Sequence, residues 1–178
     1  KESHAIALFP GGFGTHDEGF EIMTLVQTGK SDPKPIVCLQ APGCDYWDHW
    51  NSFITDQLLK RRLINAEDLS LFTIVDNVED AVTEIRTFYR RYHSLRFVGR
   101  QLAIRLKTPL SAAQVEEVQQ QFSDMLTEGT FEQRPSLPEE IDEPGLKDLA
   151  RLTFSFNRRN AGRLRQLINH LNQLPSTA

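Results

Sequence analysis

The sequence predicts an α/β chain in which a parallel sheet with helices on both faces is followed by a small α+β domain. In the first half, short apolar runs alternate with segments of helical periodicity, a pattern typical of strands joined by crossover helices. In the second half the order becomes strand, helix, strand, strand, helix. We place the boundary after residue 92, which gives domains of residues 1–92 and 93–178.

The first domain is expected to contain three strands and three helices. The strands are the apolar runs at residues 5–9, 36–40 and 69–75. Each strand is followed by a stretch of helical character, and these helices are expected to end near residues 29, 62 and 92. The aromatic residues Tyr46, Trp47 and Trp50 open the second helix. We expect them to pack in the core, with stacking on a bound base as the alternative.

The second domain is expected to begin with a strand from Ser94, where side-chain character alternates. Ser111 opens a helix with the spacing of a capping box, and Gly129 ends it. Residues 151–157 alternate again, and leucines at helical spacing predict a final helix. Four arginines near the start of that helix are expected to face an acidic partner such as residues 138–143 of the proline-rich loop, with a bound anion as the alternative; they are Arg158, Arg159, Arg163 and Arg165.

Composition limits the classes of function. The net charge of −4 argues against a general nucleic-acid binder, which would usually have a basic domain. No apolar run reaches the length of a membrane span, and no signal peptide is visible. The cysteines, Cys38 and Cys44, are too few for a disulfide framework or a four-ligand metal set. We therefore expect a cytoplasmic protein with no metal, no membrane partner and no nucleic-acid partner.

The strongest functional signal is the sequence LFPGGFGTHDEGFE at residues 8–21. A strand that ends in a glycine-rich turn and enters a helix is suited to binding an anion. Gly11, Gly12 and Gly14 let backbone N–H groups approach the anion, and the helix N-terminus adds positive partial charge. Thr15 can donate a hydroxyl hydrogen bond to the same anion. The spacing matches neither the dinucleotide fingerprint nor the ATP-binding P-loop.

Two simpler interpretations of this stretch remain open at the level of sequence. Thr15 and Glu18 have the T-x-x-E spacing of a capping box, in which the glutamate only satisfies the start of the helix. Glycines before a helix can also mark nothing more than a tight turn. A carboxylate close behind an anion loop nevertheless favours a functional site, because a ligand held by its phosphate would have its next atoms within reach of Glu18.

The segment Pro10–Glu18, PGGFGTHDE, resembles the PGGxGTxxE signature of the Lonely Guy family, the cytokinin riboside 5′-monophosphate phosphoribohydrolases. Such sequences are often labelled lysine decarboxylases. The resemblance covers about residues 3–75 and implies a Rossmann-like nucleotide-binding fold. It further implies hydrolysis of the N-glycosidic bond of a nucleoside 5′-monophosphate, a nucleosidase reaction that gives free base and ribose 5-phosphate without a cofactor.

Carried over by position, the resemblance assigns the 5′-phosphate to Gly11, Gly12, Gly14 and Thr15, and it makes Glu18 the catalytic carboxylate. Such a carboxylate would stabilise the oxocarbenium-like sugar that forms when the base departs. Family members are usually dimers, so we expect a homo-oligomer.

Three further candidates for substrate contact lie beside these residues, and they are Phe13, His16 and Glu21. The simpler interpretations, which we favour, are an exposed first-turn position for His16 and a solvated helix position for Glu21. The motif departs from the family at His16, where an aliphatic residue is usual, and at Gly19, where leucine or glutamate is common. Family members also carry earlier strands and an arginine upstream of the motif. Only nine residues precede Pro10, and none is arginine. We therefore expect this chain to resemble the C-terminal part of a longer bacterial member.

A second class of function is a binding protein without turnover, because molybdenum-cofactor carriers share a similar fold and glycine loop. Retention of Glu18 and of the upstream arginine would favour hydrolysis, whereas loss of either would favour a carrier or sensor. Lysine decarboxylation is rejected, because no lysine lies in a recognisable pyridoxal-phosphate setting.

Overall fold

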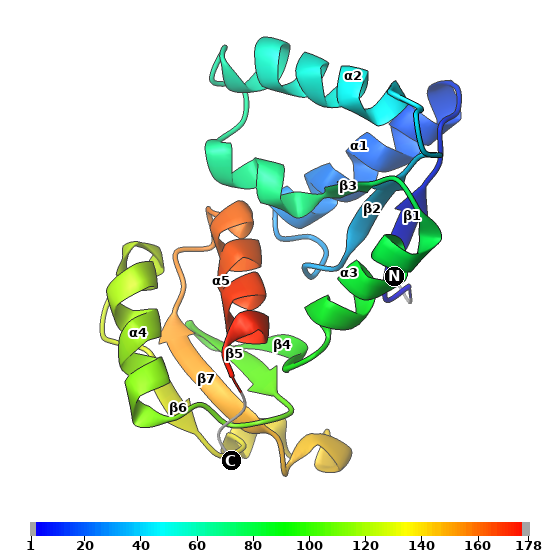
Figure 1. Cartoon of the computed structure of the whole chain (residues 1–178). Coiled ribbons are helices and arrows are strands. Elements are labelled where there is room, and N and C mark those ends of the chain that lie inside the picture. Colours follow the sequence, from blue (N-terminus) through cyan, green and yellow to red (C-terminus); the bar gives the residue numbers. More distant parts are fainter. Residues whose placement is uncertain (1–2, 176–178) are drawn as a thin grey trace. The chain divides into compact units, whose positions relative to one another are not determined.

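The computed structural model describes residues 3–175, which form two compact units (Figure 1). Unit 1 comprises the chain up to Phe88 together with Arg159–Gln166, and unit 2 comprises Tyr89–Arg158 together with the residues from Leu167 onward. The last helix, α5 (Ala161–Gln173), thus contributes its first part to unit 1 and the rest to unit 2. The domain boundary expected after residue 92 stays a prediction.

Unit 1 is built on a parallel three-stranded sheet with strand order β1-β2-β3. The strands are β1 (Ile6–Leu8), β2 (Ile36–Leu39) and β3 (Thr73–Val75). Its main helices are α1 (Phe13–Gln27), α2 (Tyr46–Phe53) and α3 (Val78–Phe88). This arrangement confirms the predicted Rossmann-like α/β architecture followed by a small domain.

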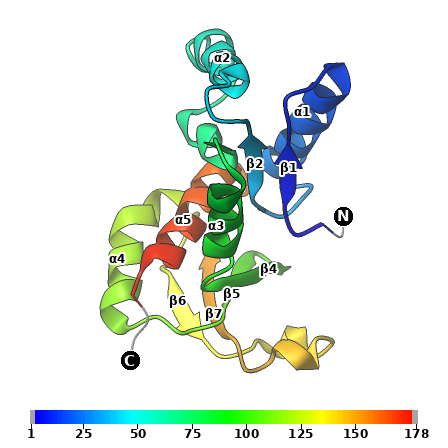
Figure 2. The same ribbon diagram turned by 45° about the vertical axis from the view of Figure 1, so that its right-hand side comes forward.

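The central strand β2 is buried on both faces, which explains its uninterrupted apolar sequence. Ile36 and Cys38 pack in one cluster with residues of α1 and α2, whereas Val37 and Leu39 pack in another with Ala81 of α3. Helices therefore cover both faces of the sheet (Figure 2). The tryptophans of α2, Trp47 and Trp50, are buried in the first cluster, so the prediction that they pack in the core is confirmed.

The helix expected to run from Tyr46 to residue 62 is shorter and irregular. The α-helix ends at Phe53 and continues as a π-helical segment, η1 (Ile54–Leu59). Arg62 lies beyond it with a φ of 59°, a left-handed conformation that a helix interior does not allow. The third predicted helix also ends early, at Phe88.

The third predicted strand was placed too early, because residues 69–71 are helical. A 3₁₀-helix, η2 (Ala66–Leu71), precedes the short strand β3. The buried Asp68 stabilises it by accepting hydrogen bonds from the backbone N–H of Asn65 at 2.9 Å and from Gln27 Nε2 at 2.7 Å. These side-chain contacts outweigh the strand preference of the apolar residues.

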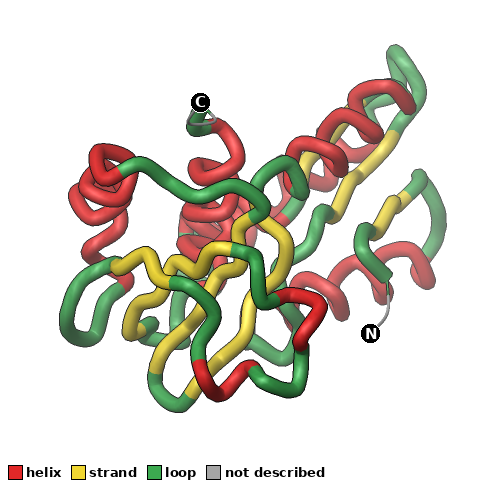
Figure 3. Tube along the Cα trace, turned by 90° about the horizontal axis from the view of Figure 1, so that it is seen from below, coloured by secondary structure: helices red, strands yellow, loops and turns green. Residues whose placement is uncertain are grey.

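Unit 2 has a separate antiparallel sheet with strand order β4-β5-β7-β6. Its strands are among the yellow segments of Figure 3. Its elements are β4 (Tyr92–Val98), β5 (Gln101–Leu106), α4 (Ala112–Phe122), β6 (Glu132–Arg134) and β7 (Ala150–Ser155). The capping box predicted at Ser111 is confirmed by reciprocal hydrogen bonds with Gln114. The single strand expected from Ser94 is instead a hairpin that turns at Gly99, whose φ is 59°.

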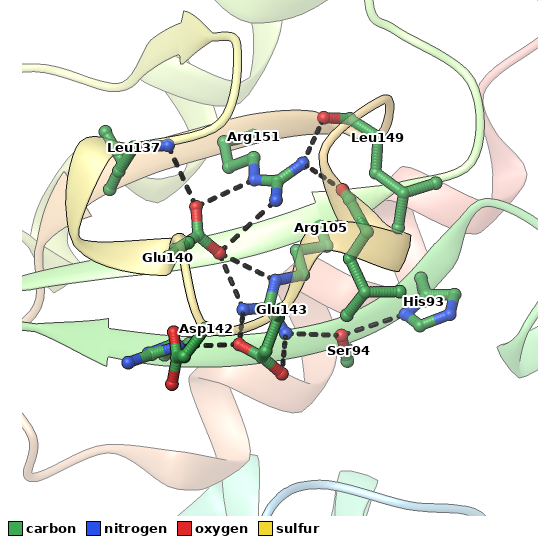
Figure 4. Close-up of polar contacts among 11 residues, drawn as sticks. His93, Ser94, Arg105, Leu137, Glu140, Asp142, Glu143, Leu149 and Arg151 are labelled. Carbon is green, nitrogen blue, oxygen red and sulfur yellow. Dashed lines mark hydrogen bonds and ion pairs between the residues drawn. The ribbon is translucent and has the colours of Figure 1, made fainter.

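The segment between β6 and β7 places a carboxylate against the sheet of unit 2. Glu140 lies between Arg105 of β5 and Arg151 of β7, and all three side chains are at most 3% exposed (Figure 4). Arg105 Nε donates to Glu140 Oε1 at 2.8 Å, and Arg151 Nε donates to Glu140 Oε2 at 2.9 Å. Glu143 accepts from Arg105 and from Arg96, the latter at 2.7 Å.

These contacts correct the predicted partners of the acidic loop, which bonds to arginines of the sheet. Of the arginines near the last helix, Arg165 donates to Glu84 at 2.7 Å and to the carbonyl of Lys34 at 2.9 Å. Arg158 donates to the carbonyl of Gly99 at 3.0 Å. Strands β5 and β7 carry one arginine each, and the register pairs Arg105 directly with Arg151, so the sheet itself supplies the cations.

Candidate functional site

The loops that follow the three parallel strands of unit 1 line a pocket of about 550 Å³. Because the strands are parallel, their carboxyl ends meet at one edge of the sheet, which is where open α/β sheets bind ligands. The lining residues are Phe9, Pro10, Leu39, Gln40, Ala41, Pro42, Cys44, Asp76, Asn77, Val78 and Glu79. Phe9 and Pro10 lead directly into the glycine loop.

The glycine loop joins β1 to α1, and the position at which α1 begins decides the role of its residues. Gly12 is the N-cap and Phe13 the first helical residue. Thr15 therefore lies inside the first turn and cannot cap the helix, so the capping-box interpretation of Thr15 and Glu18 is wrong. The carboxylate of Glu18 is consequently not engaged by the helix start.

The three glycines of the loop differ in whether the surrounding structure leaves room for a side chain. A Cβ on Gly11 would lie 2.3 Å from Thr15 Oγ1 and 3.2 Å from Thr15 Cβ, so the Thr15 side chain would have to move if residue 11 were not glycine. Gly12 and Gly14 face open space, with no heavy atom within 4 Å of an added Cβ, and neither has a positive φ. Packing and backbone strain do not account for these two glycines.

Hydrogen-bond donors gather at this end of α1. Within residues 3–175, the backbone N–H groups of Gly11, Gly12, Phe13 and Gly14 have no acceptor. The Thr15 hydroxyl likewise has no partner in this part of the chain. The first N–H groups of a helix lack intrahelical acceptors and carry positive partial charge, which suits them to an anion.

The two glutamates of α1 lie on the same side of the helix as Gly14. Gly14, Glu18 and Glu21 are spaced by four and three residues, which places them on one face. Both glutamates are exposed, and neither forms a hydrogen bond or ion pair with a described residue. Glu18 is one turn, about 6 Å along the axis, from the loop. The side chain of Phe13 is 96% exposed beside the same loop.

His16 faces the protein rather than open solvent. Its Nε2 lies 2.8 Å from the hydroxyl of Tyr46, and its ring stacks on the Tyr46 ring at a centroid distance of 5.8 Å. The same hydroxyl donates to the carbonyl of Gly11 at 2.6 Å. Because Nε2 is engaged, a ligand could meet His16 only at Nδ1. Gly19, the other departure from the motif, is buried, and an added Cβ would lie 3.1 Å from Leu8 Cδ1.

Sequence reasoning missed a second polar group at the pocket. The buried Gln40 donates from Nε2 to Asp48 Oδ2 at 2.8 Å and to Asp76 Oδ1 at 3.2 Å, and its Oε1 accepts from the backbone N–H of Trp47 at 2.8 Å. The hydrogen bond from Gln40 to Oδ1 thus fixes the Asp76 carboxylate at the pocket through one of its two oxygens. Gln40 and Asp76 each directly follow a parallel strand. Residues at this position lie at the edge of the sheet where ligands bind, so the sequence could have identified both as candidates.

Cys38, the buried cysteine of β2, is not a reactive thiol. Burial raises the pKa of the Cys38 thiol to about 12, so it stays protonated. Among residues 3–175, no cluster of three or more histidine, cysteine, aspartate or glutamate side chains is placed to hold a metal ion. In the same part of the chain, no helix combines the length and apolar character that a membrane crossing needs.

Comparison with known proteins bears on the same region. Residues 1–85 match the family model described as possible lysine decarboxylase. The match covers slightly less than half of the 178 residues and includes the glycine loop and every residue of the pocket. It agrees with the resemblance of Pro10–Glu18 to the Lonely Guy family. No curated protein matches the chain.

Proposed function

We propose that unit 1 binds a nucleoside 5′-monophosphate at the glycine loop and hydrolyses its N-glycosidic bond. The phosphate would accept hydrogen bonds from the N–H groups at Gly11, Gly12 and Gly14 and from the Thr15 hydroxyl. Glu18 would lie beside the ribose, with Phe13, His16 and Glu21 as further contacts. The family match and the loop motif support this assignment.

The observation that carries the proposal is the pair of glycines at positions 12 and 14, which neither packing nor a left-handed backbone explains. They leave the backbone donors of the helix N-terminus open to a ligand. A phosphate monoester suits such a site, because its dianion complements both the N–H groups and the helix dipole.

The proposed reaction breaks the bond between ribose C1′ and the base nitrogen. Water adds to C1′, its proton ends on the departing base, and the products are free base and ribose 5-phosphate. The sugar becomes oxocarbenium-like as the base leaves, and the Glu18 carboxylate would stabilise that charge and orient the water. Glu18 is available for this role because it caps no helix and pairs with no described residue.

The description of the matching family as possible lysine decarboxylase does not alter the proposal. Decarboxylation through pyridoxal phosphate would need a lysine for the Schiff base. In the described part of the chain, no lysine lines the pocket or belongs to the glycine loop.

The test is release of free base from a panel of nucleoside 5′-monophosphates, measured by chromatography on the full-length natural protein. Glu18→Gln is expected to lower the rate by about 100-fold or more, as loss of a catalytic carboxylate typically does. The matched control is Asp17→Asn, which removes the neighbouring exposed carboxylate of α1 and should leave the rate unchanged.

Three outcomes separate the candidate functions. Base release that depends on Glu18 but not on Asp17 supports hydrolysis at this site. Nucleotide binding without base release would refute hydrolysis and favour a carrier or sensor. Equal effects of the two substitutions would refute the role of Glu18. Self-association, proposed from the family resemblance, is tested by sedimentation of the same sample.

A further inference from the structure

The hydroxyl of Tyr46 links the glycine loop to α1 across 35 residues of sequence. It lies 2.6 Å from the carbonyl oxygen of Gly11 and 2.8 Å from Nε2 of His16. Tyr46 opens α2, and its ring meets the Trp47 ring edge-on at 4.9 Å. Trp47 is 1% exposed and donates from Nε1 to the carbonyl of Leu39 at 3.2 Å. The phenol is therefore presented to the loop by a rigid part of the core.

Counting protons assigns the direction of both hydrogen bonds. The Gly11 carbonyl can only accept, so the single proton of the Tyr46 hydroxyl goes to it. The second contact then requires His16 Nε2 to donate to the phenol oxygen. His16 must carry a proton on Nε2, which in the neutral ring leaves Nδ1 as an acceptor.

This chain of hydrogen bonds fixes the orientation of one peptide group. In a planar trans peptide the C=O of Gly11 and the N–H of Gly12 point in opposite directions. With the carbonyl held by Tyr46, the Gly12 N–H must point away from Tyr46. A peptide between two glycines rotates more easily than most, and a flip would present an oxygen where the anion site needs a donor.

We propose that Tyr46, oriented by His16, is a positioning residue that keeps the Gly12 N–H directed at the phosphate of the ligand. This inference rests on the proposed function, since it concerns the same phosphate. It also accounts for His16 in place of the usual aliphatic residue, because an aliphatic side chain could not donate to the phenol.

The test compares Tyr46→Phe with the natural protein in binding adenosine 5′-monophosphate and adenosine, by calorimetry. Loss of the hydrogen bond should weaken binding of the monophosphate by about 3- to 10-fold and leave adenosine binding unchanged. Thr28→Val is the matched control, because it removes a hydroxyl bond of 2.7 Å to the carbonyl of Thr24 at the far end of α1. It should change neither affinity.

A second readout concerns the unliganded protein. Nitrogen NMR of the His16 ring should show the proton on Nε2, and the Nδ1-protonated neutral tautomer would overturn the inference. His16→Gln, which retains a donor toward the phenol, should preserve monophosphate affinity better than His16→Leu. These measurements still decide the matter if Tyr46→Phe fails to fold.

Each binding result has one meaning. A loss confined to the monophosphate supports the positioning role. Equal losses for both ligands indicate a merely structural contact and overturn the inference, as does unchanged binding. A natural protein that binds adenosine but not the monophosphate would overturn the proposed function together with this inference.

Discussion

Replacing Glu140 by glutamine is expected to destabilise unit 2 by about 3–5 kcal/mol at pH 7, the usual cost of removing one partner from a buried ion pair. The amide retains the shape of the side chain but turns an NH₂ group toward a guanidinium. Arg105 and Arg151 are at most 3% exposed, so neither cation can recover its hydration (Figure 4). A loss of this size is a large part of the stability of a typical domain.

The pKa of the Glu140 carboxyl gives an independent value for the free energy by which this ion pair stabilises the fold. Burial acts to raise the pKa of Glu140, but hydrogen bonds from Arg151, the Leu137 backbone and Arg105 outweigh it and lower the pKa from 4.5 to about 2. A carboxyl that is more acidic in the folded state stabilises the fold above its unfolded pKa. The shift corresponds to about 3 kcal/mol at neutral pH, and this contribution is lost as the pH falls from about 4.5 to about 2.

The assay is urea denaturation followed by far-ultraviolet circular dichroism, with hydrogen exchange of the β5 and β7 amides. Both tryptophans lie in unit 1, so tryptophan emission follows that unit alone. The control Glu139→Gln alters an exposed neighbour and should shift stability by no more than about 0.5 kcal/mol. The difference between the natural protein and Glu140→Gln should narrow at pH 3. A difference below about 1 kcal/mol at pH 7, or one independent of pH, would refute the reasoning.

Further predictions concern two glycines and the two cysteines. Gly162→Ala should lower the free energy of unfolding, measured by urea denaturation, by about 1–3 kcal/mol. The reason is that the added Cβ would lie 2.4 Å from the backbone of Glu67. At Gly145 an added Cβ would face open space, so Gly145→Ala should leave the free energy of unfolding nearly unchanged. An unchanged midpoint for Gly162→Ala would contradict this close approach. A thiol reagent at pH 8 should modify the half-buried Cys44 in the folded protein but leave Cys38 unmodified until unfolding, as mass spectrometry would detect. Equal labelling rates would show that Cys38 is accessible.

Sequence was sufficient where structure depends on neighbouring residues. The apolar run before the glycines, the glycines themselves and the periodic stretch after them predicted β1, the loop and α1 in order. The capping box at Ser111 and Gln114 was recognisable for the same reason, since its hydrogen bonds span three residues. Fold class followed from the alternation of such units.

Contacts between distant residues were not predictable in this way. Asp68 is fixed by Gln27, 41 residues earlier, and that contact helps turn part of an apolar, strand-like sequence into a 3₁₀-helix. Glu140 meets Arg105 across 35 residues, and composition alone could not distinguish the sheet arginines from those of the last helix. The negative charge of Glu140 indicates that a cation must accompany it if it is buried. Which arginine lies next to it is determined by the strand register, which the sequence does not give directly.

The position at which α1 begins excludes one of the two interpretations of Glu18. The T-x-x-E spacing fits a capping box equally well whether or not Thr15 is the N-cap, so spacing alone cannot decide. The start of α1 at Phe13 decides it, because a residue within the first turn has helical geometry and cannot be the cap. Glu18 is thus an exposed carboxylate with no capping role, one turn from open backbone donors, which leaves it available for the role proposed above. The proposed binding and hydrolysis of a nucleoside monophosphate would account for the loop, Gly12, Gly14 and the carboxylate together.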